Sequence, residues 1–338
     1  MITFNNKAKT DTGCRLYNSR NQEIAYLIHP DGSIVHEFRY EQGFSWHYCE
    51  MLSNGNLLAI IKDKMIIEID SNNELVWKYN GNVHHDFSRQ ENGNTYLITG
   101  RPDTLCEELA ASCPIYLDYL EEVSPEGEVL WQWFPEDHIT EMKAHVELPA
   151  TTEFNDWPHI NTVEVLPDNP SAINDNRFRS GNILLCGRHI NTILIVDRES
   201  SKVVWAWGPS ELNGPHMPTM LPTGKILIYD NGYNTASYVT GFTRILELDP
   251  LTEKVRVVYE NPKNFYSPSR GSAEILPNGN CLIAHSDSGR LFEVTSEGEQ
   301  VWEFLNDTRD KKGNRFPIYR TTHYNLDDIP QSYFSSLT

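Results

Sequence analysis

The chain has 338 residues, of which 39% are hydrophobic and 22% charged, and its formal net charge at pH 7 is −19. So acidic a chain is repelled by phosphate backbones and anionic lipid headgroups, which argues against nucleic acid or a membrane as partner. No apolar run approaches the ~20 residues of a membrane-spanning helix. The first residues, MITFNNKAKTDTG, lack the apolar core of a signal peptide, so we expect a cytoplasmic location; a trimmed periplasmic form would look the same.

One hydrophobic segment recurs six times, each time shortly after a turn. The copies are GSIVHEF (32–38), NELVWKY (73–79), GEVLWQW (127–133), SKVVWAW (201–207), EKVRVVY (253–259) and GEQVWEF (298–304). Each follows an alternating segment such as IIEID, the pattern of a half-buried strand. The shortest steps between copies are 41 residues (His36 to Trp77) and 45 residues (Val257 to Trp302), enough for four short strands and their turns. The repeat therefore predicts an all-β fold, a six-bladed β-propeller of four-stranded antiparallel blades, with helix confined to inserted loops.

The two ends of the chain complement each other. Residues 319–329, YRTTHYNLDDI, are typical of an inner strand without the rest of its blade. Residues 14–19, 23–28 and 33–38 supply a second, third and fourth strand. Pairing the C-terminal strand with the N-terminal three closes the ring and removes open sheet edges. This predicts one domain over residues 1–338, with no strand left over.

The six cysteines form no CxxC pair of the kind that binds zinc. Four lie in or beside predicted strands and are expected to be buried thiols: Cys14, Cys49, Cys186 and Cys281. Cys106 and Cys113 flank one inserted loop and could form a disulfide in an oxidising compartment.

The turn glycines locate residues at one level of the inner strands, which line the central channel of a propeller. Counting back eight residues from Gly55, Gly93, Gly224 and Gly279 leads to His47, His85, His216 and Gly271. In the third blade, DWPHINTVEVLP places His159 and Asn161 two apart on one strand face. The closing strand offers His323. Five of six inner strands thus carry a histidine on or near the predicted channel wall.

Two arginines join these histidines. Arg188 lies at a turn of the blade that contains His159, and Arg270 begins the inner strand that lacks a histidine. Imidazoles and guanidinium groups gathered inside an acidic protein predict a site for a small anion such as sulfate, phosphate or carboxylate, held by charge-assisted hydrogen bonds. The interpretation requires no metal and no cofactor.

The chain resembles the arylsulfate sulfotransferase family, from HHDF (84–87) to about residue 304. The resemblance rests on HHDFSRQENGN, DWPHINTVEVLP, LLCGRHINTILIVD, GPHMPTMLPTGKILIYDNG and the segment from YSPSRGSAEILPNGN to GEQVWEF, in that order. Members transfer a sulfuryl group between phenols without the nucleotide donor phosphoadenosine phosphosulfate. The resemblance implies a six-bladed propeller with its active site in the central channel.

Residue by residue, the resemblance implies that His216 is a nucleophile that becomes transiently sulfated in a ping-pong reaction, with an aryl sulfate as donor and a phenol as acceptor. His159 and Arg188 would bind the sulfuryl oxygens. His85 would be the fourth member, or His84 if the register shifts by one. The remaining residues at this level are expected to contact substrate: His47, Asn161, Arg270 and His323.

The chain also departs from the family. Bacterial members generally carry an N-terminal β-sandwich domain, a secretion signal and a disulfide near the site, whereas this chain starts in the predicted propeller. Substrate specificity is expected in four insertions at the channel mouth: 100–118, 135–157, 167–181 and 231–242. Tyr233 and Tyr238 in the last are candidate stacking residues.

Two other classes of function remain open. One is a lyase or hydrolase acting on a carboxylated or sulfated sugar, with His216 or a tyrosine as base and Arg188 on the carboxylate. In a variant of it, three channel histidines hold a divalent metal, for which imidazole is a suitable ligand. The other is a non-catalytic propeller that binds a protein or a small anion.

Overall fold

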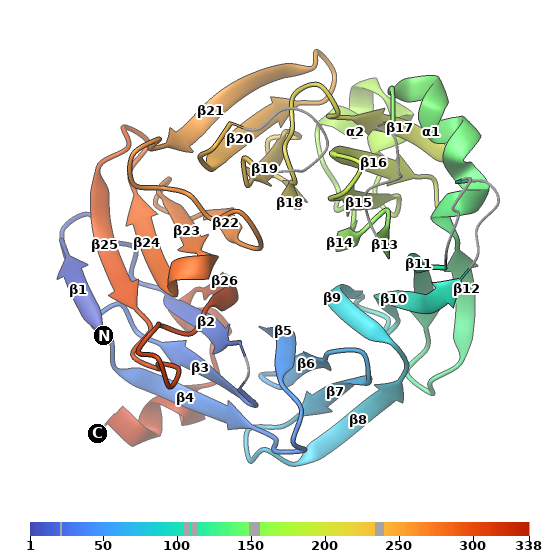
Figure 1. Ribbon diagram of the computed structural model, residues 1–338. Helices are drawn as coiled ribbons and strands as arrows, with labels where there is room; N and C mark the ends of the chain where they lie inside the picture. Colours follow the sequence, from blue (N-terminus) through green and yellow to red (C-terminus); the bar gives the residue numbers. More distant parts are fainter. Residues whose placement is uncertain (21, 105–108, 110–113, 149–155, 234–239, 338) are drawn as a thin grey trace. The chain divides into compact units, whose positions relative to one another are not determined.

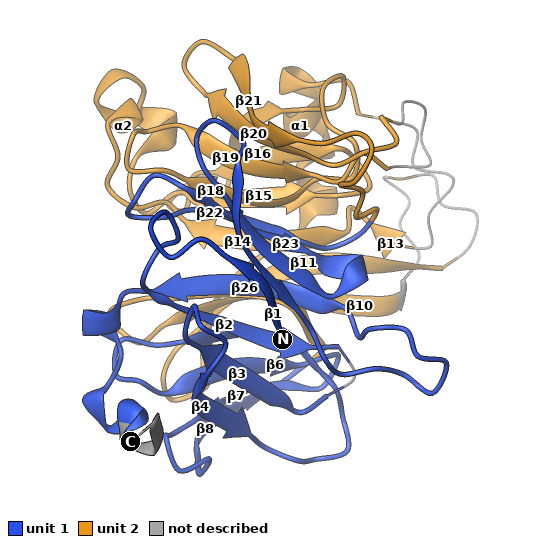
Figure 2. Ribbon diagram, turned by 90° about the vertical axis from the view of Figure 1, so that its left-hand side faces the viewer, with its two compact units in different colours: residues 1–81, 269–338 blue, residues 82–268 orange. Residues whose placement is uncertain are grey.

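The computed structural model describes residues 1–20, 22–104, 109, 114–148, 156–233 and 240–337. In this part of the chain there are six sheets, each built on four antiparallel strands, and the fold is the predicted six-bladed β-propeller (Figure 1). The chain separates into two compact units of three blades each, residues 1–81 with 269–338, and residues 82–268 (Figure 2). The interpretation of residues 1–338 as one domain stays a prediction.

The second unit, residues 82–268, contains three consecutive blades. The first has β9 (Val83–Arg89), β10 (Thr95–Thr104), β11 (Ile115–Val123) and β12 (Val129–Trp133). The next has β14 (Ile160–Val165), β15 (Ile183–Gly187), β16 (Thr192–Val196) and β17 (Val203–Trp207). The third has β18 (His216–Met220), β19 (Ile226–Asp230), β20 (Arg244–Asp249) and β21 (Lys254–Glu260). A two-residue strand, β13 (Asp156–Trp157), pairs parallel with β11.

The first unit contains the other three blades. One has β5 (Trp46–Met51), β6 (Leu57–Ile61), β7 (Met65–Ile69) and β8 (Leu75–Asn80). A second has β22 (Ser272–Ile275), β23 (Cys281–His285), β24 (Arg290–Val294) and β25 (Gln300–Leu305). The closing blade joins β26 (Ile318–Tyr324) to β2 (Cys14–Ser19), β3 (Ile24–Ile28) and β4 (Ile34–Arg39). The predicted pairing of the two ends is therefore confirmed.

Two strands were not predicted: the two-residue strand β13 and the N-terminal strand β1. β1 (Ile2–Asn5) pairs antiparallel with β25 and adds a fifth strand to that blade. The expectation that no strand is left over was wrong, because the outer edge of a blade still presents unpaired backbone groups that a further strand can satisfy.

The turns confirm the spacing from which the inner register was counted. Gly55, Gly93, Gly224 and Gly279 have φ between +79° and +87°, a conformation that glycine adopts without strain. In each turn the glycine N–H donates to the carbonyl three residues earlier, that of Leu52, Gln90, Leu221 or Leu276. The six repeated hydrophobic segments are the outermost strands of the repeat: β4, β8, β12, β17, β21 and β25.

The interior of the blades is aliphatic and aromatic. Trp205 on β17, for example, packs in one buried cluster with Leu184 and Ile226, which lie on strands of two neighbouring blades. The four cysteines expected to be buried thiols are buried and free: Cys14, Cys49, Cys186 and Cys281. Cys106 and Cys113 lie outside the described residues, and so does the disulfide considered for them.

Helix is short and follows the insertions, with α1 (Ile139–His145) in 135–157 and α2 (Ser171–Asn174) in 167–181. The described 3-10 turns are η1 (Pro135–His138), η2 (Asn176–Phe178), η3 (Ser286–Ser288), η4 (Leu326–Asp328) and η5 (Gln331–Leu337). Among the helices of the described ranges, none has the length and apolar character needed to cross a membrane.

The helix of one insertion and the whole of another lie away from the predicted channel mouth. Glu141 of α1 accepts a hydrogen bond from the Val203 N–H at 2.8 Å, so this helix covers the outer strand β17. The insertion 167–181 fills the turn between β14 and β15, where Ser171 donates to the Gly224 carbonyl at 2.7 Å. Antiparallel strands place this turn at the end of the blade opposite the start of β14, and therefore away from His159.

A buried ion pair links the N-terminal segment of the first unit to β24. Arg15 Nη2 lies 2.6 Å from Glu293 Oε2, and both side chains are fully buried. The second oxygen of Glu293 accepts from the Asp11 N–H at 2.8 Å and from Asn280 Nδ2 at 2.6 Å. The carboxylate is thus satisfied on both oxygens, and removing Arg15 would leave it buried without its counter-charge.

We predict that Arg15→Ala lowers the free energy of unfolding by about 3–5 kcal/mol, because one partner of a buried pair is left uncompensated. Urea unfolding of the whole chain measures the loss. The control is Arg39→Ala, which breaks exposed ion pairs with Glu37 and Glu41 and should have a much smaller effect.

If Arg15→Ala does not fold, the double variant Arg15→Met with Glu293→Leu decides the matter. Replacing both charges by apolar groups is often neutral or stabilising, so this variant should fold. Equal, small losses in the Arg15 and Arg39 variants would contradict the prediction.

Candidate active site

The predicted site residues divide between the two units. Five lie in the second unit: His85, His159, Asn161, Arg188 and His216. The other three lie in the first unit: His47, Arg270 and His323. The second unit therefore holds every residue for which the sequence predicted a catalytic role.

His216 is the first residue of β18, and its side chain is buried. Its Nδ1 lies 2.6 Å from Asn231 Oδ1 and 3.3 Å from the Gly214 carbonyl oxygen. Asn231 Nδ2 in turn donates to the Ser267 carbonyl at 2.7 Å, so the amide oxygen must be the atom that faces the imidazole. Both neighbours of Nδ1 are acceptors. Nδ1 therefore carries the proton, and the lone pair of the neutral ring is at Nε2.

Polar contacts from β14 hold the start of β18 in place. Asn161, fully buried, donates from Nδ2 to the Pro215 carbonyl at 2.8 Å. Thr162 Oγ1 accepts from the Met217 N–H at 2.9 Å. Met217 has φ +46°, so the backbone beside His216 leaves the extended conformation. Asn161, which we expected to contact substrate, is placed to brace the His216 strand.

Arg188 connects His159 with the His216 segment. Its backbone N–H donates to the His159 carbonyl at 3.0 Å, and Nη2 donates to the Pro268 carbonyl at 3.2 Å. A Cβ added at Gly214 would lie 3.7 Å from Arg188 Nε and 2.3 Å from the Tyr233 carbonyl oxygen. Glycine at 214, with φ +63°, thus lets the Tyr233 carbonyl approach the chain two residues before His216, and the Arg188 side chain lies near the same point.

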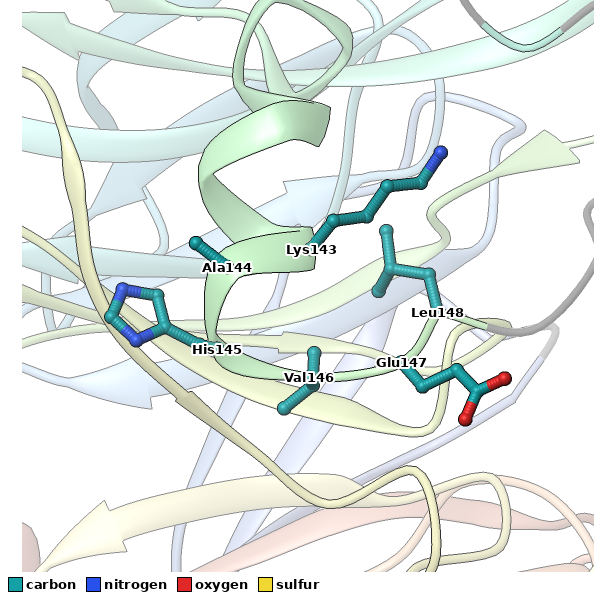
Figure 3. Close-up of a pocket in the computed structure, with 6 residues that line it drawn as sticks. All are labelled: Lys143, Ala144, His145, Val146, Glu147 and Leu148. Carbon is teal, nitrogen blue, oxygen red and sulfur yellow. The ribbon is translucent and has the colours of Figure 1, made fainter.

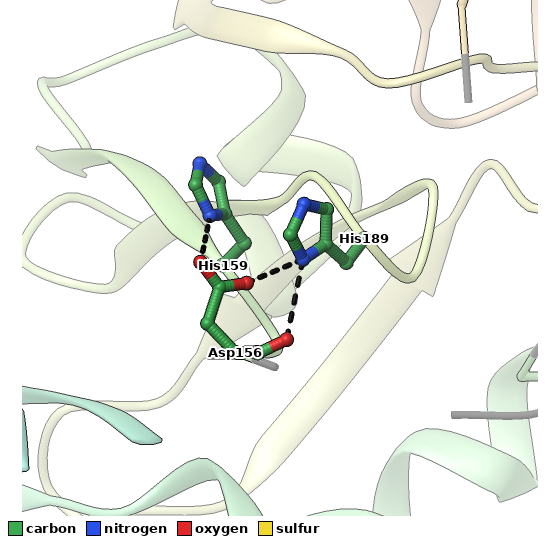
Figure 4. A group of neighbouring side chains, drawn as sticks. All are labelled: Asp156, His159 and His189. Atoms are coloured by element: carbon green, nitrogen blue, oxygen red, sulfur yellow. Dashed lines mark hydrogen bonds and ion pairs between the residues drawn. The ribbon is translucent and has the colours of Figure 1, made fainter. Parts of the chain in front are cut away.

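One carboxylate is shared by two imidazoles (Figure 4). Asp156 Oδ2 lies 2.8 Å from His159 Nδ1, and Asp156 Oδ1 lies 2.5 Å from His189 Nδ1. The His189 ring also approaches the Asp156 backbone carbonyl at 3.2 Å. The rings of His159 and His189 are 4.3 Å apart between centroids. The carboxylate therefore places the His159 proton on Nδ1, with the lone pair of the neutral ring at Nε2.

Burial and the ion pair between Asp156 and His159 shift the pKa of each partner in opposite directions. A fifth of the His159 side chain is accessible, yet desolvation outweighs the pull of Asp156 and lowers the pKa of His159 below its usual 6.5. Burial alone would raise the pKa of Asp156, but the hydrogen bonds of His159 and His189 lower it well below its usual range. Asp156 is thus ionised, and His159 in the free protein is neutral at neutral pH.

The same three side chains are those that could hold a divalent ion. One donor atom from each of Asp156, His159 and His189 lies within 4.8 Å of the others. Both Nδ1 atoms, however, face the Asp156 oxygens at 2.5 and 2.8 Å. Direct nitrogen–carboxylate pairing therefore accounts for the arrangement without an ion.

A second chain of polar side chains ends at His85. His84 Nε2 lies 3.2 Å from Asp118 Oδ1, and His84 Nδ1 lies 2.6 Å from His85 Nδ1. The His85 ring packs edge-on against His159, with 4.7 Å between centroids. His84 and Asp118 are both buried. His85, the residue to which the count from Gly93 leads, thus lies against His159, and its neighbour His84 contacts it directly.

The three residues of the first unit have partners of their own there. The His47 ring packs on Tyr319, with centroids 4.4 Å apart. Arg270, with φ +60°, pairs with Asp287 at 2.8 Å. His323 Nε2 lies 2.7 Å from Asp11 Oδ1, and its side chain is 4% exposed. The described contacts of His323 thus place it in the buried network that joins β26 to the N-terminal segment.

Four further residues of the site were missed by sequence reasoning: Asp118, Asp156, His189 and Asn231. Two of them had a local signal, since Asp156 precedes His159 by three residues and His189 directly follows Arg188. Asp118 and Asn231 had none, because their partners His84 and His216 are 34 and 15 residues away in the sequence.

Beyond Asp118 and Asp156, the described residues of the insertions add little to the lining of the histidine site. Tyr233 is 40% exposed, and Tyr238 lies outside the described residues. A hollow of about 400 Å³ lies at the end of α1 and is lined by residues 143–148 (Figure 3). It contains none of the predicted site residues, so it is separate from the histidine site.

Comparisons with solved structures agree with the fold. A protein of unknown function from Bacteroides caccae is 16% identical, with 93% of this chain and 99% of that chain covered and a TM-score of 0.58. A streptogramin B lyase is 10% identical over 94% and 92% of the two chains, with a TM-score of 0.53. A putative 6-phosphogluconolactonase from Bacteroides fragilis NCTC 9343 is 11% identical over 94% and 99%, with a TM-score of 0.51. At such identities the similarity shows the fold alone.

A search of curated proteins found no match. A family model described as Arylsulfotransferase (ASST), in contrast, matches residues 49–307, more than half of the chain and every predicted catalytic residue. The segments on which the resemblance was based lie within this range, and the chain belongs to the arylsulfotransferase family.

Proposed function

We propose that the protein is an aryl sulfotransferase that needs no nucleotide donor and moves a sulfuryl group from an aryl sulfate to a phenol through a sulfated His216. Family membership supports the class of reaction. The observation that carries the mechanism is the different partner behind each imidazole. A neutral amide faces His216, whereas carboxylates face His159 and His84.

The amide partner suits a nucleophile. With its proton on Nδ1, neutral His216 attacks the sulfur through Nε2; an N–S bond forms, and the S–O bond breaks with its electron pair going to the phenolate. A phenolate needs little protonation to leave. The neutral Asn231 carbonyl supports the ring in the sulfated state without a counter-charge that would make this intermediate too stable to react onward.

The carboxylate partner suits an anion-binding imidazole. His159 is neutral in the free protein, and a sulfuryl group beside it favours protonation, which Asp156 supports on the other side of the ring. The protonated ring and Arg188 then donate to sulfuryl oxygens. Preorganised donors of this kind contribute about 2.7–4 kcal/mol each to stabilisation of the transition state.

In the second half-reaction a phenol oxygen attacks the sulfur of sulfated His216. The phenol O–H proton goes to a base, the new O–S bond forms, and the N–S electron pair returns to Nε2. Both substrates are small molecules, the donor is an anion, and no cofactor takes part.

We predict that p-nitrophenyl sulfate alone adds one sulfuryl group to the protein and releases one equivalent of nitrophenol. His216→Ala abolishes both, because the nucleophile is gone. Intact mass spectrometry and nitrophenol absorbance measure the two products. The matched control is His145→Ala on α1, an exposed histidine outside the site, which should behave as the wild type.

Transfer is separated from hydrolysis by the acceptor. Phenol should accelerate nitrophenol release in proportion to its concentration until saturation, with phenyl sulfate as product. If several aryl sulfates gave no adduct and no turnover, the result would contradict the proposed function.

We predict that two changes at Asn231 act on different half-reactions. Asn231→Leu removes the acceptor for Nδ1–H and frees the ring to take the wrong tautomer, so the nitrophenol burst should slow by roughly 10²-fold or more. Asn231→Asp keeps the acceptor but adds a negative charge behind the ring, which stabilises the sulfated state. Rapid-quench mass spectrometry should then show a longer-lived adduct, and equal effects of both variants on both steps would contradict the assignment.

We predict that the protein binds the aryl sulfate more tightly as the pH falls from 7.5 toward 5.5. His159 has a lowered pKa and is neutral in the free protein at neutral pH, so anion binding takes up a proton, and lower pH favours the protonated ring. Calorimetry with the aryl sulfate and the unreactive His216→Ala variant, in buffers of different ionisation enthalpy, measures affinity and proton uptake together. His159→Gln should flatten the pH dependence, and unchanged proton uptake in that variant would assign the proton elsewhere.

A further inference from the structure

We propose that Asp118, His84 and His85 form a proton relay in which His85 deprotonates the acceptor hydroxyl. This inference rests on the proposed function and assigns the base that its second half-reaction needs. In the relay, His85 is the catalytic residue, and Asp118 and His84 are positioning residues.

Asp118 is fixed from two sides. It lies on β11, and its Oδ2 accepts from the Ile160 N–H at 2.5 Å, at the start of β14. Its Oδ1 lies 3.2 Å from His84 Nε2, and each of these two side chains is 3% exposed. The carboxylate therefore cannot turn away from His84 without releasing the backbone of the neighbouring blade.

The contacts give the relay a direction. Asp118 Oδ1 makes an ion-pair contact of 3.2 Å with His84 Nε2, and because a carboxylate oxygen is an acceptor, this contact favours a proton of His84 on Nε2. In a neutral ring His84 Nδ1 is then an acceptor. It lies 2.6 Å from His85 Nδ1, which must supply the proton of this hydrogen bond. The lone pair of neutral His85 is thereby directed to Nε2.

The contact between two sequence neighbours depends on a distorted strand. Adjacent side chains of a regular strand point to opposite faces of the sheet. His85 instead has φ +58°, and the pairing of β9 with β10 shifts register between Leu97 and Thr99. Such bulges re-aim side chains and are over-represented next to active sites. Here the bulge brings the two rings together, at 85° between their planes.

His85 also lies beside the residues that would hold the sulfuryl group. Its ring is 4.7 Å from that of His159 between centroids, and the His159 carbonyl accepts from the Arg188 N–H. The groups that face the relay are Asp118 from β11, the Tyr116 ring 5.6 Å from that of His84, and His159 from the segment before β14.

The step balances as follows. The acceptor O–H bond breaks, and its proton goes to His85 Nε2. The oxygen forms a bond to sulfur, the bond from sulfur to His216 Nε2 breaks, and its electron pair stays on His216. Asp118 stabilises the resulting positive charge through His84, and His85 later returns the proton to solvent.

Asp118→Asn tests the direction of the relay with little change of shape. The amide oxygen can still accept from the Ile160 N–H, while the amide nitrogen donates to His84 Nε2. His84 then carries its proton on Nδ1, so His85 Nδ1 becomes the acceptor and Nε2 carries the proton. His85 is thus no longer a base at the atom proposed to meet the acceptor.

We predict that Asp118→Asn leaves the nitrophenol burst within twofold of the wild type and slows transfer from the adduct to phenol by about 10²–10⁴-fold, the usual contribution of a general base. Acceptors acidic enough to be ionised at the assay pH need no base and should react at nearly the wild-type rate. Rapid mixing of the adduct with phenols of graded acidity measures this dependence. His84→Gln should show the same selective loss, and Asp137→Asn, an exposed carboxylate of the same unit, should show none.

Equal slowing for all phenols, or no slowing, would overturn the relay while the burst still supports the proposed function. Absence of the burst in the wild type would overturn the proposed function and this base assignment together. Histidine side-chain ¹⁵N NMR tests the relay without turnover. It should show an unprotonated Nε2 on His85 in the wild type and a protonated one in Asp118→Asn; the same tautomer in both proteins would also overturn it.

Discussion

A residue that is not extended lies at or near the start of each inner strand of the second unit. His85, His159 and Met217 have φ between +46° and +60°. In this region the backbone of a residue other than glycine is strained by about 1–3 kcal/mol. Such strain persists only if the surroundings hold the backbone. Here the neighbouring blades supply amide clamps: Asp118 accepts from Ile160, Asp86 from Val163, and Thr162 from Met217. The hydrogen bonds from Asp118 and Thr162 thus hold the backbone directly beside His159 and His216.

The blades repeat one another in fold, and the partners of their histidines explain why the site itself is not repeated. Each blade contributes the same strand and the same turn, so a histidine at the inner register recurs. What differs is the group behind it: a carboxylate behind His159, an amide behind His216, and a second imidazole behind His85. Each partner sets a proton on one ring nitrogen, and each has a different effect on the charged form. Three similar side chains are thus suited to the three different roles proposed for them.

The sequence predicted the features that depend on local pattern. The turn glycines have the positive φ that the count assumed, and the strand at 318–324 pairs with β2 as expected. The features it did not predict depend on distant partners. Asn231 is recognisable as a partner of His216 only when β18 and β19 are paired, and Asp118 as a partner of His84 only when β9 and β11 lie in one sheet, on either side of β10. The insertion 167–181 was misplaced because the length of a loop does not say at which end of the blade its turn lies.

In the proposed two-step transfer, an amide behind His216 is better suited than a carboxylate. There the sulfated ring would form from an aryl sulfate and be cleaved by a phenol, so its free energy would have to lie close to those of both esters. A carboxylate at position 231 would favour the charged, sulfated ring and slow its cleavage, whereas an apolar residue would leave the tautomer unset. The Asn231 carbonyl, held by the Ser267 carbonyl through the amide nitrogen, orients the ring and adds no charge. By the same reasoning, a carboxylate suits an imidazole that is proposed to take up a proton: Asp156 contacts His159 directly, and Asp118 contacts His84, the partner of His85.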